Sequence, residues 1–192
     1  MKYFVLFGPP GAGKGTHATF VAEKYNLKHI STGELLRAEI AAGTELGKTA
    51  KSLIDAGSLV PDEVVEGMID SAFDRFQEFN GFLLDGFPRT LAQAEALDAM
   101  LEKRGETLTG VVSIMISDDM VKARIQHRAA IEGRADDANE ETINNRIATY
   151  HNQTEPLIEY YKASGRYHEV NGESPVIEEN RKRVLDLVET LV

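Results

Sequence analysis

The feature that most constrains this chain is a glycine-rich segment that directly follows a continuous apolar run at residues 3–7. Its glycines allow backbone torsions that other residues avoid, and they let successive N–H groups face one anion. A helical pattern over residues 14–25 begins at its end, so the positive end of a helix points at the same place. The sequence therefore predicts a buried strand, an anion-binding loop and a helix, with the loop formed by Gly8, Pro9, Pro10, Gly11, Ala12, Gly13, Lys14, Gly15 and Thr16.

This segment resembles the phosphate-binding P-loop, whose pattern is G-x-x-x-x-G-K-[ST]. We expect Lys14 to reach the outer phosphates of a nucleotide as a point charge, and the Thr16 hydroxyl to reach phosphate or metal. The segment departs from the pattern at Gly15, which stands where a P-loop has Ser or Thr. That departure weakens the case for a hydroxyl that binds Mg²⁺ directly.

Apolar runs alternate with helical patterns along the chain, which predicts an α/β fold with a doubly wound parallel sheet. With 192 residues, 42% of them hydrophobic, the chain is long enough for one domain and too short for two full ones. We expect strands at 3–7, 28–30, 82–84, 111–116 and 167–170, and helices at 14–25, 31–41, 45–56, 61–79, 91–104, 120–132, 140–162 (with a kink or break at Pro156) and 176–192.

Two segments interrupt this alternation. Residues 31–60 contain two helical patterns with no strand between them, and residues 126–138 are short and polar. Both could be flaps over a site, and both could be surface insertions without a role.

Asp85 ends the apolar run at residues 82–84. The carboxyl ends of parallel strands line the ligand crevice of an open sheet, so Asp85 should face the same side as the glycine-rich loop. There it suits a Walker-B role, holding Mg²⁺ through water, because Mg²⁺ keeps part of its hydration shell. The alternative is an aspartate that caps the next turn.

The charge balance limits the partners of the chain. Lys and Arg total 21 against 31 Asp and Glu, a formal net charge of −10, so the basic footprint of a nucleic-acid-binding protein is absent. Any anion must be held by a local cluster of cations. If the chain moves a phosphoryl group from one nucleotide to another, the repulsion between their phosphates must be cancelled. Two unit charges about 4 Å apart interact by ~4 kcal/mol at an effective dielectric near 20, so several arginines must converge on one site. Candidates are Arg37, Arg89, Arg124, Arg128, Arg134 and Arg146, whereas we expect Arg104, Arg166, Arg181 and Arg183 at the solvated surface.

At these residues the chain resembles the adenylate kinase family along its whole length. The matching motifs are residues 8–16, the segment STGELLR at 31–37, the segment GFLLDGFPR at 81–89 and the segment GRADD at 133–137. The resemblance implies Mg²⁺-dependent phosphoryl transfer from ATP to AMP that gives two ADP. It also implies one P-loop domain, a three-layer α/β/α core with a five-stranded parallel sheet (residues 1–30, 61–126 and 138–192). To this core it adds a small helical AMP-binding segment at 31–60 and a short lid at 127–137.

The resemblance also assigns site residues, position by position. Lys14, Arg89, Arg128, Arg134 and Arg146 would be catalytic. ATP would contact Gly11, Ala12, Gly13, Lys14, Gly15, Thr16, Arg124, Arg128 and the backbone of Ser174. AMP would contact Thr32, Arg37, Ser58, Leu59, Val60, Gly86, Phe87, Pro88, Arg89, Gln93, Arg134 and Arg146. Asp136 and Asp137 would hold the closed lid, or be surface charges.

Two other functions compete with this interpretation. A uridylate or cytidylate kinase shares the P-loop, the short lid and the arginines, but Thr32 and Gln93 fit adenine recognition better. A nucleotide switch of the GTPase type needs Asn-Lys-x-Asp and Asp-x-x-Gly, and the chain has neither.

The remaining expectations concern metals, membranes and location. The chain has no cysteine and no metal spacing among its five histidines, so we expect no zinc site. The first residues lack the apolar region of a signal peptide, and no apolar stretch is long enough to span a membrane. We therefore expect a cytoplasmic protein without a membrane partner. The resemblance to adenylate kinases implies ATP and AMP as partners, and we expect a monomer that does not bind nucleic acid.

Overall fold

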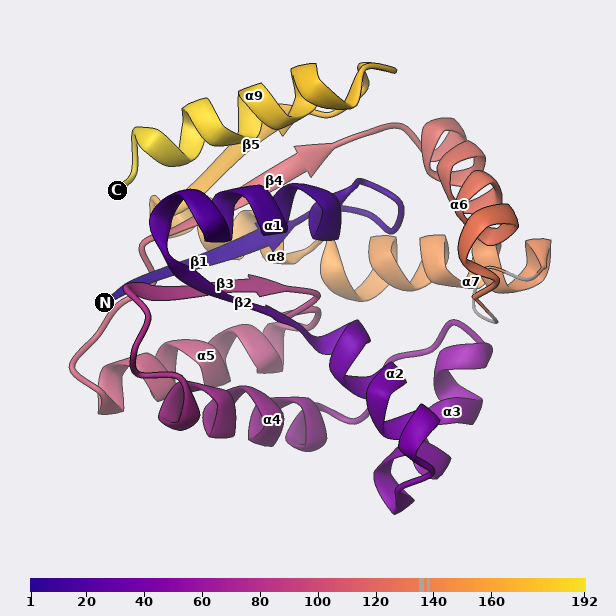
Figure 1. Cartoon of the computed structure of the whole chain (residues 1–192), viewed down its shortest axis with the longest axis horizontal. Coiled ribbons are helices and arrows are strands. Elements are labelled where there is room, and N and C mark those ends of the chain that lie inside the picture. Colours follow the sequence, from indigo (N-terminus) through magenta and orange to yellow (C-terminus); the bar gives the residue numbers. More distant parts are fainter. Residues whose placement is uncertain (135–136, 138) are drawn as a thin grey trace.

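The computed structural model describes residues 1–134, 137 and 139–192 of the chain. In this part of the chain five parallel strands form one sheet, as expected, and their order is β2-β3-β1-β4-β5 (Figure 1). The strands are β1 (Lys2–Phe7), β2 (Leu27–Ser31), β3 (Gly81–Asp85), β4 (Gly110–Met115) and β5 (Tyr167–Asn171).

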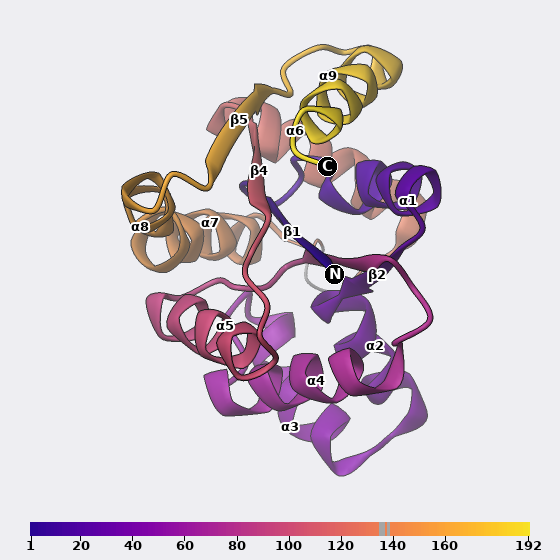
Figure 2. The ribbon, with the colours of Figure 1, turned by 90° about the vertical axis from the view of Figure 1, so that its left-hand side faces the viewer.

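Helices cover both faces of the sheet and make a three-layer arrangement (Figure 2). One face carries α1 (Lys14–Tyr25) and α9 (Ile177–Glu189), and the other carries α4 (Asp62–Arg75), α5 (Leu91–Lys103) and α8 (Leu157–Ala163). Because side chains alternate along a strand, β1 serves both layers. Phe4 and Leu6 pack toward α1 and α9, whereas Tyr3, Val5 and Phe7 pack into the opposite core.

Both interruptions of the alternation lie at the end of the sheet to which the strands point (Figure 1). The first is the pair α2 (Thr32–Ala42) and α3 (Glu45–Asp55), and the second is bounded by the end of α6 (Asp118–Glu132) and the start of α7 (Glu140–Thr149). The Ser31 side chain caps the start of α2, since it accepts a hydrogen bond from the backbone N–H of Glu34. Among the described residues, no helix combines the length and the apolarity needed to cross a bilayer.

The helix expected at 140–162 breaks before Pro156. A π-helical turn, η2 (Tyr150–Thr154), separates α7 from α8, and at its end the N–H of Glu155 donates to the carbonyl of Tyr150. Proline has no N–H and its ring crowds the carbonyl four residues back, so a regular helix cannot continue through position 156. Tyr150 and Thr154 of this wider turn are both buried.

The helix expected at 61–79 ends early, at Arg75. The residue after the expected helix, Asn80, is hydrogen-bonded at the edge of the sheet. The N–H of Asn80 donates to the carbonyl of Asn26, and the carbonyl of Asn80 accepts from the N–H of Lys2. The residues before Asn80 must therefore leave the helix to reach the strand edge.

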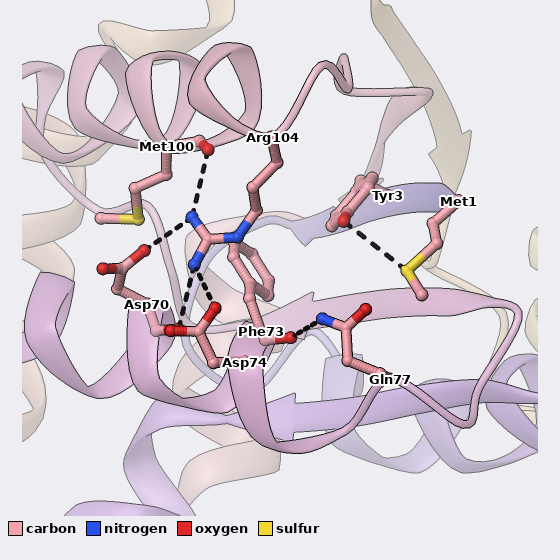
Figure 3. Close-up of polar contacts among 8 residues, drawn as sticks. All are labelled: Met1, Tyr3, Asp70, Phe73, Asp74, Gln77, Met100 and Arg104. Carbon is pink, nitrogen blue, oxygen red and sulfur yellow. Dashed lines mark hydrogen bonds and ion pairs between the residues drawn. The ribbon is translucent and has the colours of Figure 1, made fainter.

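The expectation that Arg104 and Arg166 are solvated surface side chains is wrong. Figure 3 shows Arg104 between α4 and the end of α5, where it pairs with Asp70 at 2.8 Å and with Asp74 at 2.8 Å. Arg166 likewise forms a two-point ion pair with Asp98, at 2.6 and 3.0 Å. A single sequence does not show that carboxylates from another helix meet these guanidinium groups.

Arg181 is also not free in solvent, because its guanidinium carbon lies 3.5 Å from the centroid of the Phe20 ring. Arg183 is exposed, as expected, and donates to the carbonyl of Asn171.

Candidate functional site

The glycine-rich loop connects β1 to α1 with backbone torsions that glycine favours. Gly8, Gly11 and Gly13 have φ of 139°, 78° and 86°. At Gly8 a Cβ atom would also lie 2.5 Å from the carbonyl oxygen of Ile114, so no larger residue fits there. The loop ends at Gly13, which caps α1, and the helix points its positive end into the concave side of the loop.

Lys14 lies folded back onto this loop. Its Nζ donates to the carbonyls of Gly8 and Pro9, each at 3.0 Å. Burial lowers the pKa of Lys14 to about 8; Asp85 opposes that shift, while Arg89 and two further arginines add to it. Three arginines thus lie close enough to repel the Lys14 ammonium group, and an anionic ligand bound between these cations would reduce their mutual repulsion.

Asp85 lies at the end of β3, beside the loop, and is 8% exposed. Burial raises its pKa, but His29, whose Nε2 lies 3.5 Å from Oδ2, together with Lys14 and Arg89 holds the pKa below its usual value. A Cβ atom at Gly15 would lie 3.4 Å from Asp85 Oδ2. Because Gly15 stands where a P-loop has Ser or Thr, position 15 places no side chain in the space beside the Asp85 carboxylate.

The ionised Asp85 is the kind of oxygen ligand that Mg²⁺ takes, with the remaining positions filled by water and substrate phosphates. In the described part of the chain no three His, Asp or Glu side chains are grouped to hold a metal by themselves. The residues present therefore fit Mg²⁺ that arrives with a nucleotide.

A cavity opens at the carboxyl ends of β1, β2 and β3, between the α2–α3 pair and η2. It brings together most of the residues expected to contact AMP. Those that line it are Thr32, Arg37, Ser58, Leu59, Val60, Gly86, Pro88, Arg89, Gln93 and Arg146, together with Lys14 from the glycine-rich loop.

The turn after β3 is held firmly at the base of this cavity. The Thr32 hydroxyl donates to the carbonyl of Gly86 at 2.9 Å. Gly86 has φ of 82°, and a Cβ there would lie 2.8 Å from both Thr32 Oγ1 and Arg89 Nη2. The backbone of Arg89 is held from two sides, since its N–H donates to Gln93 Oε1 at 2.8 Å and its carbonyl accepts from Thr154 Oγ1 at 2.7 Å.

Arg128 of α6, Arg146 of α7 and Arg134 between these helices form ion pairs with the protein's own carboxylates. The Asp137 side chain is completely buried, accepts two hydrogen bonds of 2.7 Å from Arg128, and accepts one of 2.6 Å from Arg146. Burial raises the pKa of Asp137, but Arg128, Arg146 and Arg134 outweigh it and hold the pKa below its usual value. Arg134 pairs with Glu132 and does not line the cavity.

Arg124 lies against the loop that follows β5. Its Nη2 donates to the carbonyl of Gly172 at 2.6 Å and to that of Ser174 at 3.4 Å. Asn180 of α9 also donates to the Ser174 carbonyl, at 2.8 Å. Two residues expected at one ATP subsite, Arg124 and Ser174, are therefore in contact.

The chain is similar to known proteins of one family. A family model described as adenylate kinase matches residues 6–166. The chain belongs to the adenylate kinase family. Proteins named adenylate kinase from Bacteroides thetaiotaomicron and Leptospira biflexa are 50% and 49% identical over 172 residues, which is 90% of this chain and 90% and 92% of theirs. An adenylate kinase from Flavobacterium psychrophilum is 47% identical over 191 residues, 100% of both chains.

Not every residue expected from the adenylate kinase resemblance lies in the cavity. Phe87 is 1% exposed and packs into the core, so only its backbone can serve a ligand. Of the residues expected to contact ATP, Gly11, Ala12, Gly13, Gly15, Thr16, Arg124, Arg128 and Ser174 lie outside the cavity lining. Asp136 falls outside the described residues.

The structure also adds residues that the sequence analysis did not select. Thr149, Tyr150 and Thr154 line the cavity from η2 and the end of α7. Pro156 was the available signal, because a break in a helix two residues before a proline can expose side chains on an unexpected face. Asp62, which contacts Gln93, carried no signal beyond its place at the start of a helix.

Proposed function

We propose that this chain catalyses reversible phosphoryl transfer from ATP to AMP, giving two ADP, the reaction implied by its family. The observation that carries the proposal is the composition of the cavity lining. Lys14 of the phosphate loop, Arg89, Arg146 and Gln93 all line the same cavity. A cavity with cations at its junction with the phosphate loop and a carboxamide in its wall suits a nucleoside monophosphate.

AMP is proposed to bind in this cavity with its phosphate toward the loop. Arg37, Arg89 and Arg146 would hold the phosphate, since guanidinium groups bind phosphate oxygens in pairs. Thr32, the backbone of residues 58–60 and Gln93 would surround the base, with Gly86, Phe87 and Pro88 forming the turn beneath it.

ATP is proposed to bind on the other side of Lys14. The backbone N–H groups of residues 11–16 and the Arg128 side chain would hold its phosphates. The guanidinium of Arg124 would stack on the adenine, beside the backbone of Ser174. Asp85 would hold Mg²⁺ through water, and the ion neutralises phosphate charge when it is bound with the nucleotide.

The reaction in this scheme needs no covalent intermediate. Phosphoryl transfer requires in-line positioning and positive charge around the transferred group. Lys14 would follow that group and Arg128 would contact the ATP phosphates, while Arg134 and Arg146 would bridge the phosphates of the two nucleotides. To do so, Arg128 and Arg146 must exchange Asp137 for phosphate oxygens.

Two segments are proposed to move as the nucleotides bind. Residues 31–60 form the AMP-binding segment, and residues 127–137 form the short lid over the core of residues 1–30, 61–126 and 138–192. Their closure would exclude water, which otherwise competes with AMP as the acceptor.

We further propose that the protein works as a cytoplasmic monomer without a nucleic-acid or membrane partner. Sedimentation tests the oligomeric state, and cell fractionation tests the location.

A coupled assay of ADP formation tests the proposed function. Purified protein with Mg²⁺ and ATP should form ADP rapidly with AMP, and much more slowly with UMP or CMP. Faster turnover with either pyrimidine nucleotide would assign the chain to the uridylate or cytidylate kinases. No ADP formation with any of the three acceptors would reject a monophosphate kinase altogether.

A further inference from the structure

We infer that Asp62, a residue without an assigned role, makes the acceptor site selective for 6-aminopurines by fixing the orientation of the Gln93 carboxamide. The inference rests on the proposed function, since it concerns the base of the nucleotide in the AMP cavity. It is carried by two hydrogen bonds at the two ends of one buried amide. Gln93 Nε2 donates to Asp62 Oδ1 at 2.8 Å, and Gln93 Oε1 accepts from the Arg89 N–H at 2.8 Å.

The chemistry of the two partners determines which end of the amide is which. A carboxylate can only accept hydrogen bonds, so it must face the Nε2 end of Gln93. A backbone N–H can only donate, so it must face Oε1. If the amide of Gln93 rotated by half a turn, its oxygen would face the Asp62 carboxylate and its NH₂ group would face the Arg89 N–H. Both hydrogen bonds would be replaced by repulsive contacts in a side chain that is 2% exposed.

Asp62 is itself held in place. It is half-buried in the first turn of α4, where the positive end of the helix favours a carboxylate. The Thr90 hydroxyl donates to the same Oδ1 at 3.0 Å, and Thr90 also caps α5 by accepting from the Gln93 N–H at 3.2 Å. The carboxylate therefore joins the starts of α4 and α5 around the Gln93 side chain.

A fixed carboxamide distinguishes purines by what they present at position 6. After its two internal hydrogen bonds, Gln93 has one N–H and one lone pair of Oε1 left for a ligand. Adenine presents an amino donor at C6 and an acceptor at N1, which match that oxygen and that N–H. A 6-oxopurine presents an acceptor at C6 and a donor at N1, so it would match only the rotated amide, which Asp62 prevents. A site built around fixed polar groups rejects the base that leaves them unpaired.

The test compares AMP with inosine monophosphate, which differs at position 6 and N1 and adds no group at C2. In D62N the new side-chain amide can donate as well as accept, so residue 62 no longer opposes the rotated amide of Gln93, and only the Arg89 N–H still does. We expect the AMP/inosine monophosphate ratio of kcat/KM to fall about tenfold, equivalent to ~1.4 kcal/mol, with the KM for ATP unchanged. The matched control is E63Q, which removes the same charge from the next, exposed residue of α4 and should keep the wild-type ratio.

A double variant separates orientation from a general weakening of the fold. In a Q93L background, D62N should leave the AMP/inosine monophosphate ratio unchanged, because no carboxamide remains to be oriented. D62A provides a second loss of the carboxylate if D62N folds poorly, as judged by the melting temperature. A wild-type ratio in folded D62N and D62A, or an equal change in the Q93L background, would overturn the inference. Failure of the wild-type protein to phosphorylate AMP would instead overturn the proposed function.

Discussion

In the acceptor cavity the protein fixes the backbone of an arginine, whereas beside the segment proposed as the lid it fixes the guanidinium groups of two arginines. In the cavity the backbone of Arg89 is held by Gln93 and Thr154, and Thr32 holds the turn below it. Beside the segment proposed as the lid, Arg128 and Arg146 are held by their guanidinium groups, through the buried carboxylate of Asp137, and Arg146 reaches the cavity from this side.

The comparison shows what the protein itself fixes at each proposed nucleotide site: the backbone of Arg89 at one, and the guanidinium groups of Arg128 and Arg146 at the other. The acceptor side fixes the position from which its arginine extends, so a ligand meets a framework that already exists. If phosphate binds Arg128 and Arg146 as proposed, it must displace their ion pairs with Asp137, and we propose that this couples ligand binding to movement of the lid. Four substitutions or measurements can break or sharpen this comparison, and they follow from the largest expected effect to the smallest.

Replacing Arg89 by Gln should reduce kcat/KM for ADP formation by about 10³-fold. Arginines that stabilise the charge of a transferring phosphoryl group contribute on the order of 10³–10⁵ to the rate. Steady-state kinetics with ATP and AMP measure the effect, and R183Q, at an exposed arginine, is the control. If kcat/KM of R89Q stays within tenfold of the wild-type value, Arg89 does not neutralise the charge of the transferring phosphoryl group.

Replacing Asp137 by Asn should lower the free energy of unfolding of the nucleotide-free protein by about 3 kcal/mol, because two cations lose a buried partner. The lowered pKa of Asp137 fixes the pH dependence. Its contribution is present above the ordinary pKa of an aspartate, about 3.9, and is lost as pH falls through the lower pKa of the folded protein.

Urea unfolding at pH 7, with D186N at an exposed ion pair as the control, measures this loss. The difference between D137N and wild type should shrink when two adenosines joined by five phosphates are bound, since phosphates then occupy both arginines. An equal loss with and without that ligand would contradict the proposed exchange.

Lys14 should make ATP binding sensitive to pH in a range where an ordinary lysine does not titrate. Its pKa is lowered to about 8, so the free protein loses this charge as pH rises through that value. ATP affinity should therefore fall by about tenfold between pH 8 and pH 9–10, since each pH unit above the pKa lowers the charged fraction tenfold. Calorimetric titration measures the affinity, and K14R, which stays charged, should show weaker but pH-independent binding.

The same shift affects stability in the opposite direction. The unfolded chain binds more protons at Lys14 between pH 8 and 10.5, so the nucleotide-free protein should gain stability as pH rises through this window. A flat ATP affinity for wild type from pH 7 to 10 would show that Lys14 is not held in this crowded environment.

Replacing Thr154 by Val should have the smallest effect, raising the KM for AMP about fivefold while leaving the KM for ATP unchanged. It removes one hydrogen bond to the carbonyl of Arg89, worth about 1 kcal/mol, at nearly constant volume. T149V, which makes the same change at a neighbouring residue of the cavity wall, is the natural control. A change in the KM for ATP as large as that for AMP would contradict a role restricted to the acceptor side.

The parts of the molecule that could be predicted from the sequence are those encoded by local patterns. The apolar runs indicated all five strands, and the glycine-rich segment with the helical pattern after it indicated the loop and α1. Contiguous motifs also carried the family resemblance, which supplied the list of site residues.

The parts that could not be predicted depend on side chains that meet across long sequence distances. Asp62 and Gln93 are 31 positions apart, and Thr154 and Arg89 are 65 apart. The single sequence does not reveal such partners, nor does it show that Asp98 meets Arg166 or that Asp70 meets Arg104. The π-helical turn arises from the packing that Pro156 forces, and a helical pattern alone does not specify it.

The most direct test of the account is a crystal structure of the protein with two adenosines joined by five phosphates. The account predicts one adenine against Gln93, the other against Arg124, and the guanidinium groups of Arg128 and Arg146 on phosphate oxygens instead of Asp137. A complex in which both arginines still bind Asp137, or in which no base lies beside Gln93, would contradict the central claim that these two sites face each other across one phosphate-binding cluster.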